Sequence, residues 1–297
     1  MDSLESIRSK SEGAKDLKSV VSALKAMASA NIVQYEAAVA SLSEYYHTVA
    51  LGIIAYFKAE KIEAISQKKK TKKNKDSLIC AIVFGSDQGL VGQFNDSMAE
   101  FVFKSLNAMP GKKELWVVGE RVQLLLSDMG FAVSDNYTVP SDVGAITPLV
   151  GQMLDKSETR HGSEDIQIYI FHNQPNPGTG YRQIMQRFLP LDEKWKDDLQ
   201  QLQWSTKILP QIAGAPKPTL LELIRSYLFV SLFRACAESL SSENASRLEA
   251  MQRAEKNIGD LLDELTKKYN RLRQSSIDEE LFDVVSGFEA MKQDAAN

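Results

Sequence analysis

The stretch GSDQGLVGQFN, residues 85–95, holds the residues whose types and spacing most readily suggest chemistry. It follows the apolar run LICAIVF and precedes a segment with helical spacing. Glycine-rich turns between a strand and a helix often bind phosphate, because free backbone N–H groups and the positive end of the helix dipole both point at the anion. The first hypothesis is therefore a nucleotide site, and with it an enzyme.

The spacing argues against the two common phosphate-binding motifs. A P-loop ends in Gly-Lys-Ser/Thr, whereas Gly92 is followed here by Gln93 and Phe94. A dinucleotide fingerprint needs G-x-G-x-x-G, and the glycines at positions 85, 89 and 92 have a different spacing. Asp87 would also repel a phosphate. We interpret the stretch as a tight strand-to-helix turn that needs positive φ and close backbone packing, and we predict no cofactor.

The remaining reactive side chains do not form a recognisable catalytic or metal site. The three histidines, at positions 47, 161 and 172, have no metal-binding spacing, and we interpret each as a surface or capping residue. Cys80 lies inside a predicted strand and is expected to be buried and inert. The sequence thus predicts no catalytic residue and no metal ligand.

Composition sets the broad class of the protein. The chain has 297 residues and a formal net charge of −4, which does not favour nucleic-acid binding. Its two cysteines fit a reducing compartment rather than a disulfide scaffold. No apolar run approaches the roughly 20 residues of a membrane span, and the first residues resemble neither a signal peptide nor a transit peptide. These features together predict a cytosolic protein.

Both flanks of the chain lack proline, since the first proline is Pro110 and the last is Pro218. The N-terminal flank carries a heptad repeat, which predicts a coiled-coil helix over residues 1–66. The first register consists of Ile7, Ala14, Val21, Ala28, Tyr35, Leu42, Val49 and Tyr56. The weaker second register consists of Lys10, Leu17, Leu24, Asn31, Ala38, Tyr45 and Gly52.

The C-terminal flank repeats this pattern and predicts one helix over residues 219–292. Its main register is Asn244, Met251, Ile258, Leu265 and Leu272. The apolar pattern then resumes, shifted by one residue, at Ile277, Leu281, Val284, Phe288 and Met291. At about 1.5 Å per residue such a helix is on the order of 110 Å long, so its apolar stripe needs a partner along its length. The N-terminal helix, folded back antiparallel, is the expected partner.

The middle of the chain, residues 77–213, has a different pattern. Short apolar runs such as LICAIVF, ELWVVG and DIQIYIFHN alternate with helical segments. This alternation predicts an α/β domain with a mainly parallel, Rossmann-like sheet, inserted between the two halves of an antiparallel coiled coil. Asn95 is expected to cap the first helix of this domain. A lysine-rich linker, residues 67–76, precedes the domain and is interpreted as solvated chain or as a contact with acidic lipid or a partner.

Several motifs, in order along nearly the whole chain, resemble the gamma subunit of F-type ATP synthases. SIRSK resembles that family's opening Ile-Arg-x-Lys, and FLPL resembles the end of its late strand. GSDQGLVGQFN resembles its Ser-Asp-x-Gly-Leu-x-Gly-x-Asn signature. The C-terminal flank resembles the family's Ala-Met-x-x-Ala-x-x-Asn, Tyr-Asn-x-x-Arg-Gln, Ile-x-x-Glu-Leu and Val-Ser-Gly pattern.

The resemblance implies a function as well as a fold. The family's coiled coil is the central rotor stalk and sits in the bore of an alpha/beta catalytic hexamer. Its α/β domain contacts the epsilon subunit and rides on the membrane c-ring. A member would couple ion-driven rotation to ATP synthesis or hydrolysis without catalysing a reaction itself, and would lie peripherally at the cytoplasmic face of the membrane in a bacterium or archaeon.

The resemblance also assigns roles to individual residues. The family's contact with a catch loop of the hexamer falls on Arg273, Gln274, Asp278 and Glu280. The alternative interpretation is that they are ordinary exposed helix residues. The upper bearing of the hexamer would receive Ile277, Leu281, Val284 and Phe288. The family's signature turn falls on Ser86, Asp87, Gly89, Leu90, Gly92 and Asn95.

The sequence also departs from the family pattern. Ser19 and Ser22 stand where the family usually has lysines, which weakens a basic collar facing the catalytic subunits. The foot reads WSTKILP, residues 204–210, and lacks the tyrosine and glutamate expected near the ring. These departures favour a divergent copy, from an alternative ATPase. They also leave open a family-derived coiled-coil adaptor that no longer rotates, and a small-molecule enzyme based on the α/β domain remains a third hypothesis.

Overall fold

The computed structural model describes residues 3–59, 78–163, 166–176, 180–191 and 215–294, together with four single positions, 195, 199, 202 and 208. The chain divides into two compact units. Unit 1 consists of residues 1–27 and 248–297, and unit 2 consists of residues 28–247. The lysine-rich linker predicted at residues 67–76 lies outside the described residues.

Two long helices belong to both units. Helix α1 spans Leu4–Ala59 and helix α6 spans Pro216–Asp294. Helix α6 begins three residues before the predicted Thr219, because Pro216 and Pro218 lie in its first turn, where a missing N–H costs no helical hydrogen bond. The glycines inside the two helices are tolerated at about 1 kcal/mol each.

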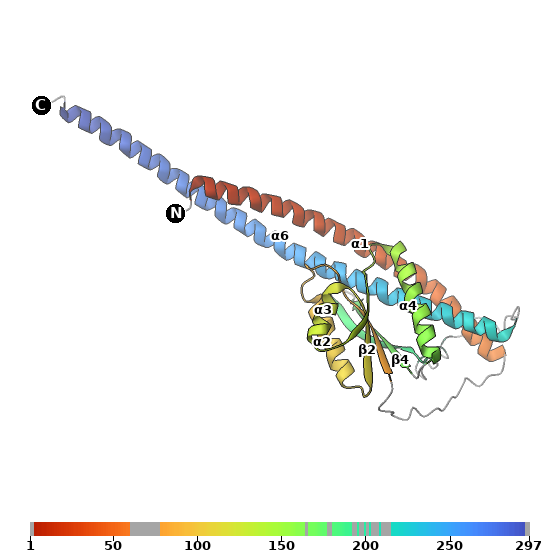
Figure 1. Ribbon diagram of the computed structural model, residues 1–297. Coiled ribbons are helices and arrows are strands. Elements are labelled where there is room, and N and C mark those ends of the chain that lie inside the picture. Colours follow the sequence, from red (N-terminus) through yellow and green to blue (C-terminus); the bar gives the residue numbers. More distant parts are fainter. Residues whose placement is uncertain are drawn as a thin grey trace. The chain divides into compact units, whose positions relative to one another are not determined.

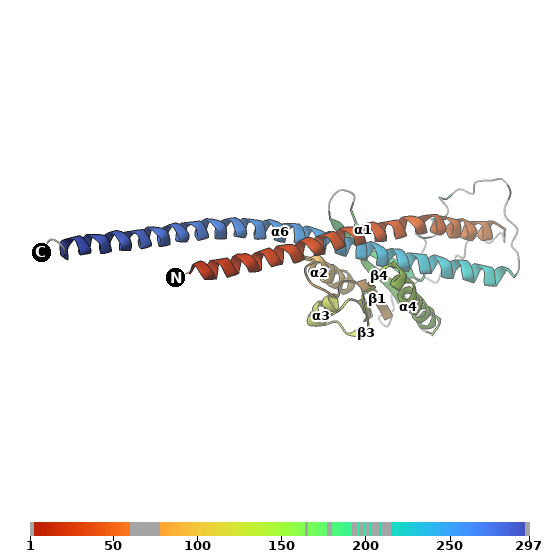
Figure 2. The ribbon, with the colours of Figure 1, turned by 90° about the horizontal axis from the view of Figure 1, so that it is seen from above.

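In unit 1, the two helices lie side by side and antiparallel (Figures 1 and 2). Ile7 and Ala14 of α1 and Met251 and Leu265 of α6 are buried. Lys25 of α1 donates a hydrogen bond of 2.5 Å to Glu255 of α6. The predicted antiparallel pairing is thus confirmed, and α6 continues past the N-terminal end of α1.

Unit 2 contains a five-stranded sheet in the order β3-β2-β1-β4-β5. Its strands are β1 (Leu78–Phe84), β2 (Lys112–Val118), β3 (Val133–Tyr137), β4 (Ile166–Pro175) and β5 (Tyr181–Leu189). All neighbouring pairs are parallel except β4 and β5, which confirms the prediction of a mainly parallel sheet. Strand β3 was not predicted, because VSDNY is a polar edge strand with no buried position.

Helices cover both faces of this sheet (Figure 1). Helices α2 (Phe94–Asn107) and α3 (Glu120–Asp128) lie on one face, while α4 (Val143–Ser163) and part of α6 lie on the other. Strand β1 serves both cores, since Ile79, Ala81 and Val83 pack against α2 and α3 and the alternate residues pack toward α4 and α6. This two-sided burial explains why LICAIVF is continuously apolar.

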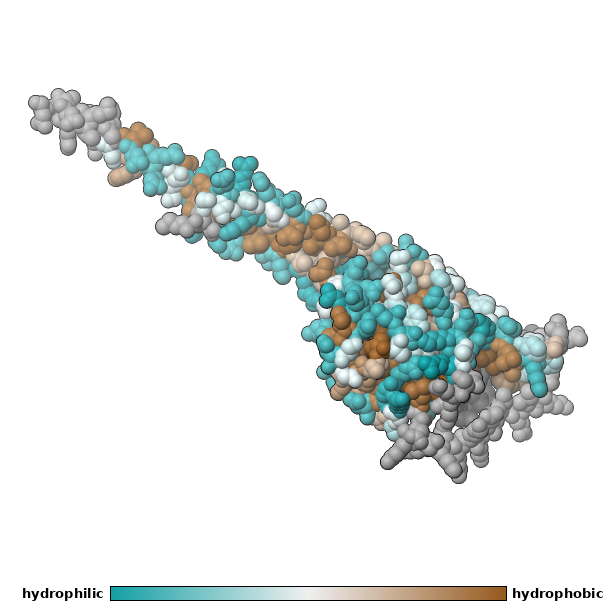
Figure 3. Space-filling view, in the orientation of Figure 1, coloured by the Kyte–Doolittle hydropathy of each residue, from teal (hydrophilic) through white to brown (hydrophobic). Residues whose placement is uncertain are grey.

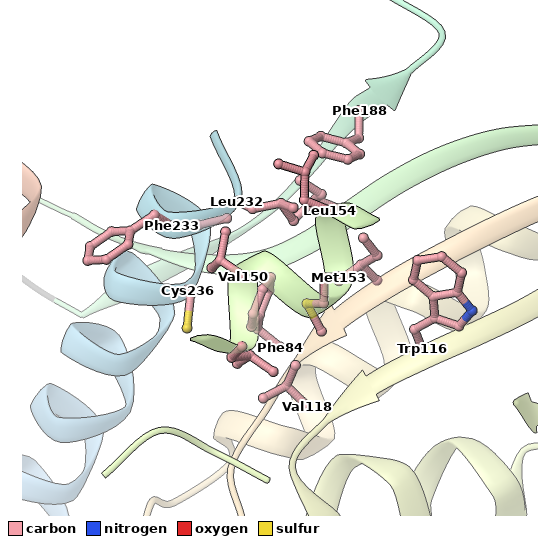
Figure 4. Close-up of a cluster of buried hydrophobic side chains, with 14 of the residues drawn as sticks. Phe84, Trp116, Val118, Val150, Met153, Leu154, Phe188, Leu232, Phe233 and Cys236 are labelled. Carbon is pink, nitrogen blue, oxygen red and sulfur yellow. The ribbon is translucent and has the colours of Figure 1, made fainter. Parts of the chain in front are cut away.

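The core on the α4 and α6 side ties the long helix to the sheet. Figure 4 shows Leu232, Phe233 and Cys236 of α6 beside Val150 of α4, with Phe84 of β1 close by. In α6, residues 228–240 are almost all buried, as their sequence predicted. A separate cluster, formed by Val49, Ala50, Ile53 and Ile54 of α1 with Leu199, lies near the C-terminal end of α1.

Candidate functional site

The signature turn, residues 85–95, is held together by its own polar side chains. The buried Asn95 accepts a hydrogen bond from the backbone N–H of Ser86 at 3.0 Å and donates one to Ser86 Oγ at 2.8 Å. The residue that precedes helix α2 is Gln93. Our prediction that Asn95 caps α2 is therefore wrong, because its amide joins the two ends of the turn instead.

Asp87 ties the turn to two neighbouring loops. Its Oδ1 accepts a hydrogen bond from the backbone N–H of Glu120, and its Oδ2 accepts one from that of Val139, both at 2.9 Å. Glu120 is the first residue of α3, so the Asp87 carboxylate lies at the positive end of that helix. The N-terminus of a helix is where an anionic ligand would bind, and in α3 the carboxylate of Asp87 already occupies that position.

Close packing and positive φ angles explain much of the rest of the turn. A Cβ on Gly85 would lie 2.2 Å from Cγ1 of Val122 on α3, so only glycine fits there. Positive φ occurs at Gly92, with φ of 56°, and at Leu90, with φ of 64°. Gly89 has neither a positive φ nor a close neighbour, and so does not need to be glycine. The predicted tight turn is thus confirmed at positions 85 and 92 but not at 89.

The turn is also attached to α6. Ser246 Oγ donates a hydrogen bond of 2.6 Å to the backbone carbonyl of Val91, and Val91 itself is buried. The next residue back along the chain, Leu90, is 65% exposed. Leu90 therefore projects from the turn while its neighbour anchors the turn to the helix.

His172 is buried, with 2% exposure, so our interpretation of it as a surface or capping residue is wrong. Its Nε2 lies 3.0 Å from Oε2 of Glu238 on α6, and Nε of Arg234 donates to the other oxygen of Glu238 at 2.7 Å. Burial alone would raise the pKa of Glu238, but the hydrogen bonds from His172 and Arg234 outweigh it and lower that pKa. A single histidine at the end of an apolar strand gave no signal of this buried link.

The predicted catch residues lie in unit 1 on the C-terminal part of α6. Arg273, Gln274, Asp278 and Glu280 are exposed, and none of them has a hydrogen bond or ion pair within the described part of the chain.

Cys80 is buried inside β1, as expected. Nowhere among the described residues do three or more histidine, cysteine, aspartate or glutamate side chains gather as a metal site.

The predicted bearing residues lie on the same segment. Ile277 is 51% exposed, Leu281 63% and Val284 70%, whereas the side chain of Phe288 lies outside the described residues. With 3.6 residues per turn, the catch and bearing residues fall within an arc of about 160° on one face of α6. That face is rotated by roughly 100° from the stripe that contacts α1. The apolar residues beyond position 276 are thus not a continuation of the α1 contact.

A second exposed apolar stripe lies on α1 and was missed by the heptad analysis. Leu17, Val20 and Met27 are 60%, 57% and 62% exposed, with Leu24 half-buried between them. Figure 3 shows apolar surface on this part of the paired helices. The second register was therefore wrong at Lys10, Leu17 and Tyr45, which are all exposed, although the first register is buried or half-buried throughout. The 3-4 spacing of the stripe was the available signal.

None of the helices within the described residues has the length and hydropathy needed to cross a membrane.

The chain's fold resembles that of known rotor proteins. Residues covering 92% of this chain superpose, with a TM-score of 0.62 and 17% identity, on 98% of a chain from the rotor of the Euglena gracilis mitochondrial ATP synthase. A central-stalk chain of the Tetrahymena thermophila enzyme gives a TM-score of 0.54 at 19% identity, over 79% of this chain and 99% of that one.

Sequence comparison extends this likeness beyond the fold. The ATP synthase gamma chain of Glaesserella parasuis is 31% identical over 71% of this chain and 73% of its own length. That of Bdellovibrio bacteriovorus is 25% identical over 98% of this chain and 100% of its own length. The family model described as ATP synthase matches residues 3–291. The chain therefore belongs to the gamma-chain family, which forms the central rotor stalk of F-type ATP synthases.

Proposed function

We propose that this chain is the central-stalk rotor subunit of an F-type ATP synthase and couples rotation of a c-ring to ATP synthesis or hydrolysis in an alpha/beta hexamer. The observation that carries this proposal is the family match over residues 3–291, which includes both long helices and the sheet between them. The epsilon subunit and the c-ring are the expected partners of unit 2. The chain would lie peripherally at the cytoplasmic face of the membrane, held there through the ring.

The exposed faces of unit 1 support this role. Leu17, Val20 and Met27 on α1 and the segment from Ile277 to Val284 on α6 expose more apolar surface than a helix pair needs in water. Two unlike faces on one shaft are also what a rotor needs, because a shaft with identical faces could not hold three catalytic sites in three different states. The hexamer bore is the partner that would cover them.

We further propose that the chain catalyses no reaction itself. The anion position at the start of α3 is filled by Asp87, whose two oxygens already accept hydrogen bonds from backbone N–H groups. Cys80 and Cys236 are buried, and burial raises the pKa of both thiols far above the range of a reactive thiolate. The nucleotide chemistry would therefore take place in neighbouring subunits.

Co-purification tests the rotor assignment. A tagged full-length chain, expressed in its native cell, should bring down the alpha and beta subunits together with epsilon. Recovery of only unrelated proteins would support the adaptor hypothesis and overturn the rotor proposal. Equilibrium dialysis of the isolated chain against ATP and NAD should detect no tight binding, and a tight complex would overturn the non-catalytic assignment.

The bearing can be tested with one pair of substitutions. Leu281→Gln with Val284→Gln should weaken coupling in the assembled enzyme while leaving the thermal unfolding of the isolated chain unchanged, because both side chains are already exposed. The matched control is Leu265→Gln, which places a polar group at a position only 7% exposed and should destabilise the isolated chain. If ATP hydrolysis stays fully coupled to rotation in the double variant, the proposal that Leu281 and Val284 contact the bearing of the hexamer is contradicted.

A further inference from the structure

Unit 2 contains a cleft of about 620 Å³ between α1, the β4–β5 hairpin and α6. Helix α1 contributes Glu36, Val39 and Tyr46 to its walls, the hairpin contributes Gln174 and Arg182, and α6 contributes Arg234. A volume of this size falls within the range of small-molecule sites. The proposed rotor function uses none of these side chains.

A smaller polar chamber of about 190 Å³ adjoins the cleft, and the two share Tyr46, Gln174, Arg234 and Glu238 as lining residues. His172 lines only the chamber and is 2% exposed. Its Nε2 is engaged with Glu238, but its Nδ1 has no hydrogen-bond partner within the described residues. Because buried polar groups are normally hydrogen-bonded, an unpaired ring nitrogen beside a cavity indicates that a polar ligand binds in the chamber.

The negative charge of Glu238 is already compensated inside the protein. Its two oxygens contact His172 Nε2, Arg234 Nε and the amide nitrogen of Gln174. With four contacts on two oxygens, this carboxylate has little remaining capacity to accept a further hydrogen bond, and its charge is balanced by that of Arg234.

The two guanidinium groups of the cleft have N–H donors that no described residue uses. Arg182 donates from Nε and Nη2 to Oε1 of Gln174, a neutral acceptor, and makes no ion pair in the described part of the chain. Arg234 uses only Nε on Glu238, which leaves the four N–H groups on its terminal nitrogens without a described partner. Glu36 is the one opposing carboxylate that faces the cleft without a described partner. Glu238 balances the charge of Arg234, and Glu36 opposes that of Arg182, so the cleft carries no formal net charge. The N–H donors that the two guanidinium groups leave unused are what favour an oxyanion.

We propose that the cleft binds a small oxyanion, held by Arg234 and Arg182, with its uncharged part reaching toward the chamber lined by His172. A phosphate and a carboxylate share this chemistry, because both accept paired N–H donors from arginine. The ligand would join α1, the hairpin and α6, so its binding would stabilise the contacts between the long helices and the sheet within unit 2.

Isothermal titration of the full chain tests this site, with sodium phosphate in one arm and sodium acetate in the other. Ionic strength is held constant with sodium chloride, so that general salt effects cancel. We expect one site for at least one of the two anions. Binding of phosphate alone identifies a phosphate-type site, and binding of acetate alone identifies a carboxylate-type site. No heat of binding for either anion up to about 10 mM, a concentration at which ΔG is only about −3 kcal/mol, would overturn the proposal.

Substitutions assign the binding to the cleft. Arg234→Gln and Arg182→Gln should each weaken binding about tenfold or more, because each removes a charge-assisted pair of donors. Glu36→Gln should strengthen it by removing the opposing charge. The control is Arg253→Gln, an exposed arginine of α6 in unit 1, which should leave binding unchanged. Arg182 is exposed, so its variant tests the site even if Arg234→Gln fails to fold. Equal affinity in the Arg182 and control variants would overturn the assignment.

Discussion

The carboxylate of Asp87 accepts a hydrogen bond of 2.9 Å from the backbone N–H of Glu120, 33 residues later in the chain. The other carboxylate oxygen holds the backbone N–H of Val139 at the same distance. One short side chain thus joins the loops that follow β1, β2 and β3. The acidic residue that argued against phosphate in the sequence is the residue that fills the anion position in the fold.

Replacing Asp87 should therefore destabilise the domain. Asp87→Ala leaves two backbone N–H groups without their acceptor and removes a favourable charge at the start of α3, so we expect a loss of about 1–3 kcal/mol in the free energy of unfolding. Urea denaturation of the full chain measures it. Asp128→Ala, at the opposite end of the same helix, should change stability by less than about 0.5 kcal/mol. Equal stability of the two variants would contradict the capping role.

The glycines of the signature turn should differ in their tolerance of alanine. Gly85→Ala places a Cβ within 2.5 Å of two Val122 atoms and should cost about 1–3 kcal/mol. Gly89→Ala meets nothing closer than 3.9 Å and needs no positive φ, so it should be neutral or slightly stabilising. Thermal unfolding of both variants provides the comparison, and similar melting temperatures would show that the turn relaxes around residue 85.

Two buried glutamates of α6 should respond to pH with opposite signs. Hydrogen bonds from His172 and Arg234 lower the pKa of Glu238 despite its burial, so the stability that its ionised form contributes is present above the unfolded pKa and is lost as the pH falls through the folded value. Burial raises the pKa of Glu243, even though Arg247 opposes the shift, so its contribution is present below the unfolded pKa and is lost as the pH rises through the folded value.

Matched amide substitutions separate these two effects. The stability advantage of the natural chain over Glu238→Gln should shrink as the pH falls below the ordinary glutamate pKa of about 4.3, because the ionised carboxylate is then lost. The advantage over Glu243→Gln should instead shrink as the pH rises above the ordinary glutamate pKa of about 4.3. Denaturant unfolding at several pH values measures both differences. Curves that move in the same direction would refute the assignment of one of the two shifts.

The catch assignment predicts a functional defect without a folding defect. Arg273→Ala with Gln274→Ala should lower ATP turnover coupled to rotation by about tenfold or more, because a lost charged hydrogen bond is worth about 1.5–3 kcal/mol. Circular dichroism should show unchanged helicity, since both residues are exposed. The control pair, Gln252→Ala with Arg253→Ala, places the same residue types elsewhere on α6. Unchanged turnover in the first pair would count against the catch.

Patterns that are local in sequence were predicted well. The first heptad register of α1 and the main register of α6 are both buried or half-buried. A 3-4 repeat places its apolar residues on one face of a helix, and that face is removed from water only by packing against a partner. The run LICAIVF forms a strand buried on both faces, since only the centre of a parallel sheet accepts seven such residues in succession. The signature turn was likewise recognised as a tight turn from its glycines alone.

Long-range polar contacts could not be predicted in the same way. The link between His172 and Glu238 spans 66 residues, and nothing in either local sequence distinguishes these side chains from exposed ones. Leu17 satisfied a heptad position yet points away from α6, because repeat analysis fixes which residues share a face but not which face meets the partner helix. Strand β3 was missed for a related reason, since an edge strand pairs through its backbone and needs no apolar pattern.

The sequence by itself determined the family, the two long helices and the presence of a mainly parallel sheet, because these depend on motifs and periodicities carried by neighbouring residues. The tertiary structure alone decided how isolated polar residues are used. It placed Asp87 on the N–H groups of α3 and of the loop after β3, and it buried His172 beside Glu238. A buried polar group is stabilised by partners that are distant in sequence, and only the folded chain brings those partners within hydrogen-bonding distance.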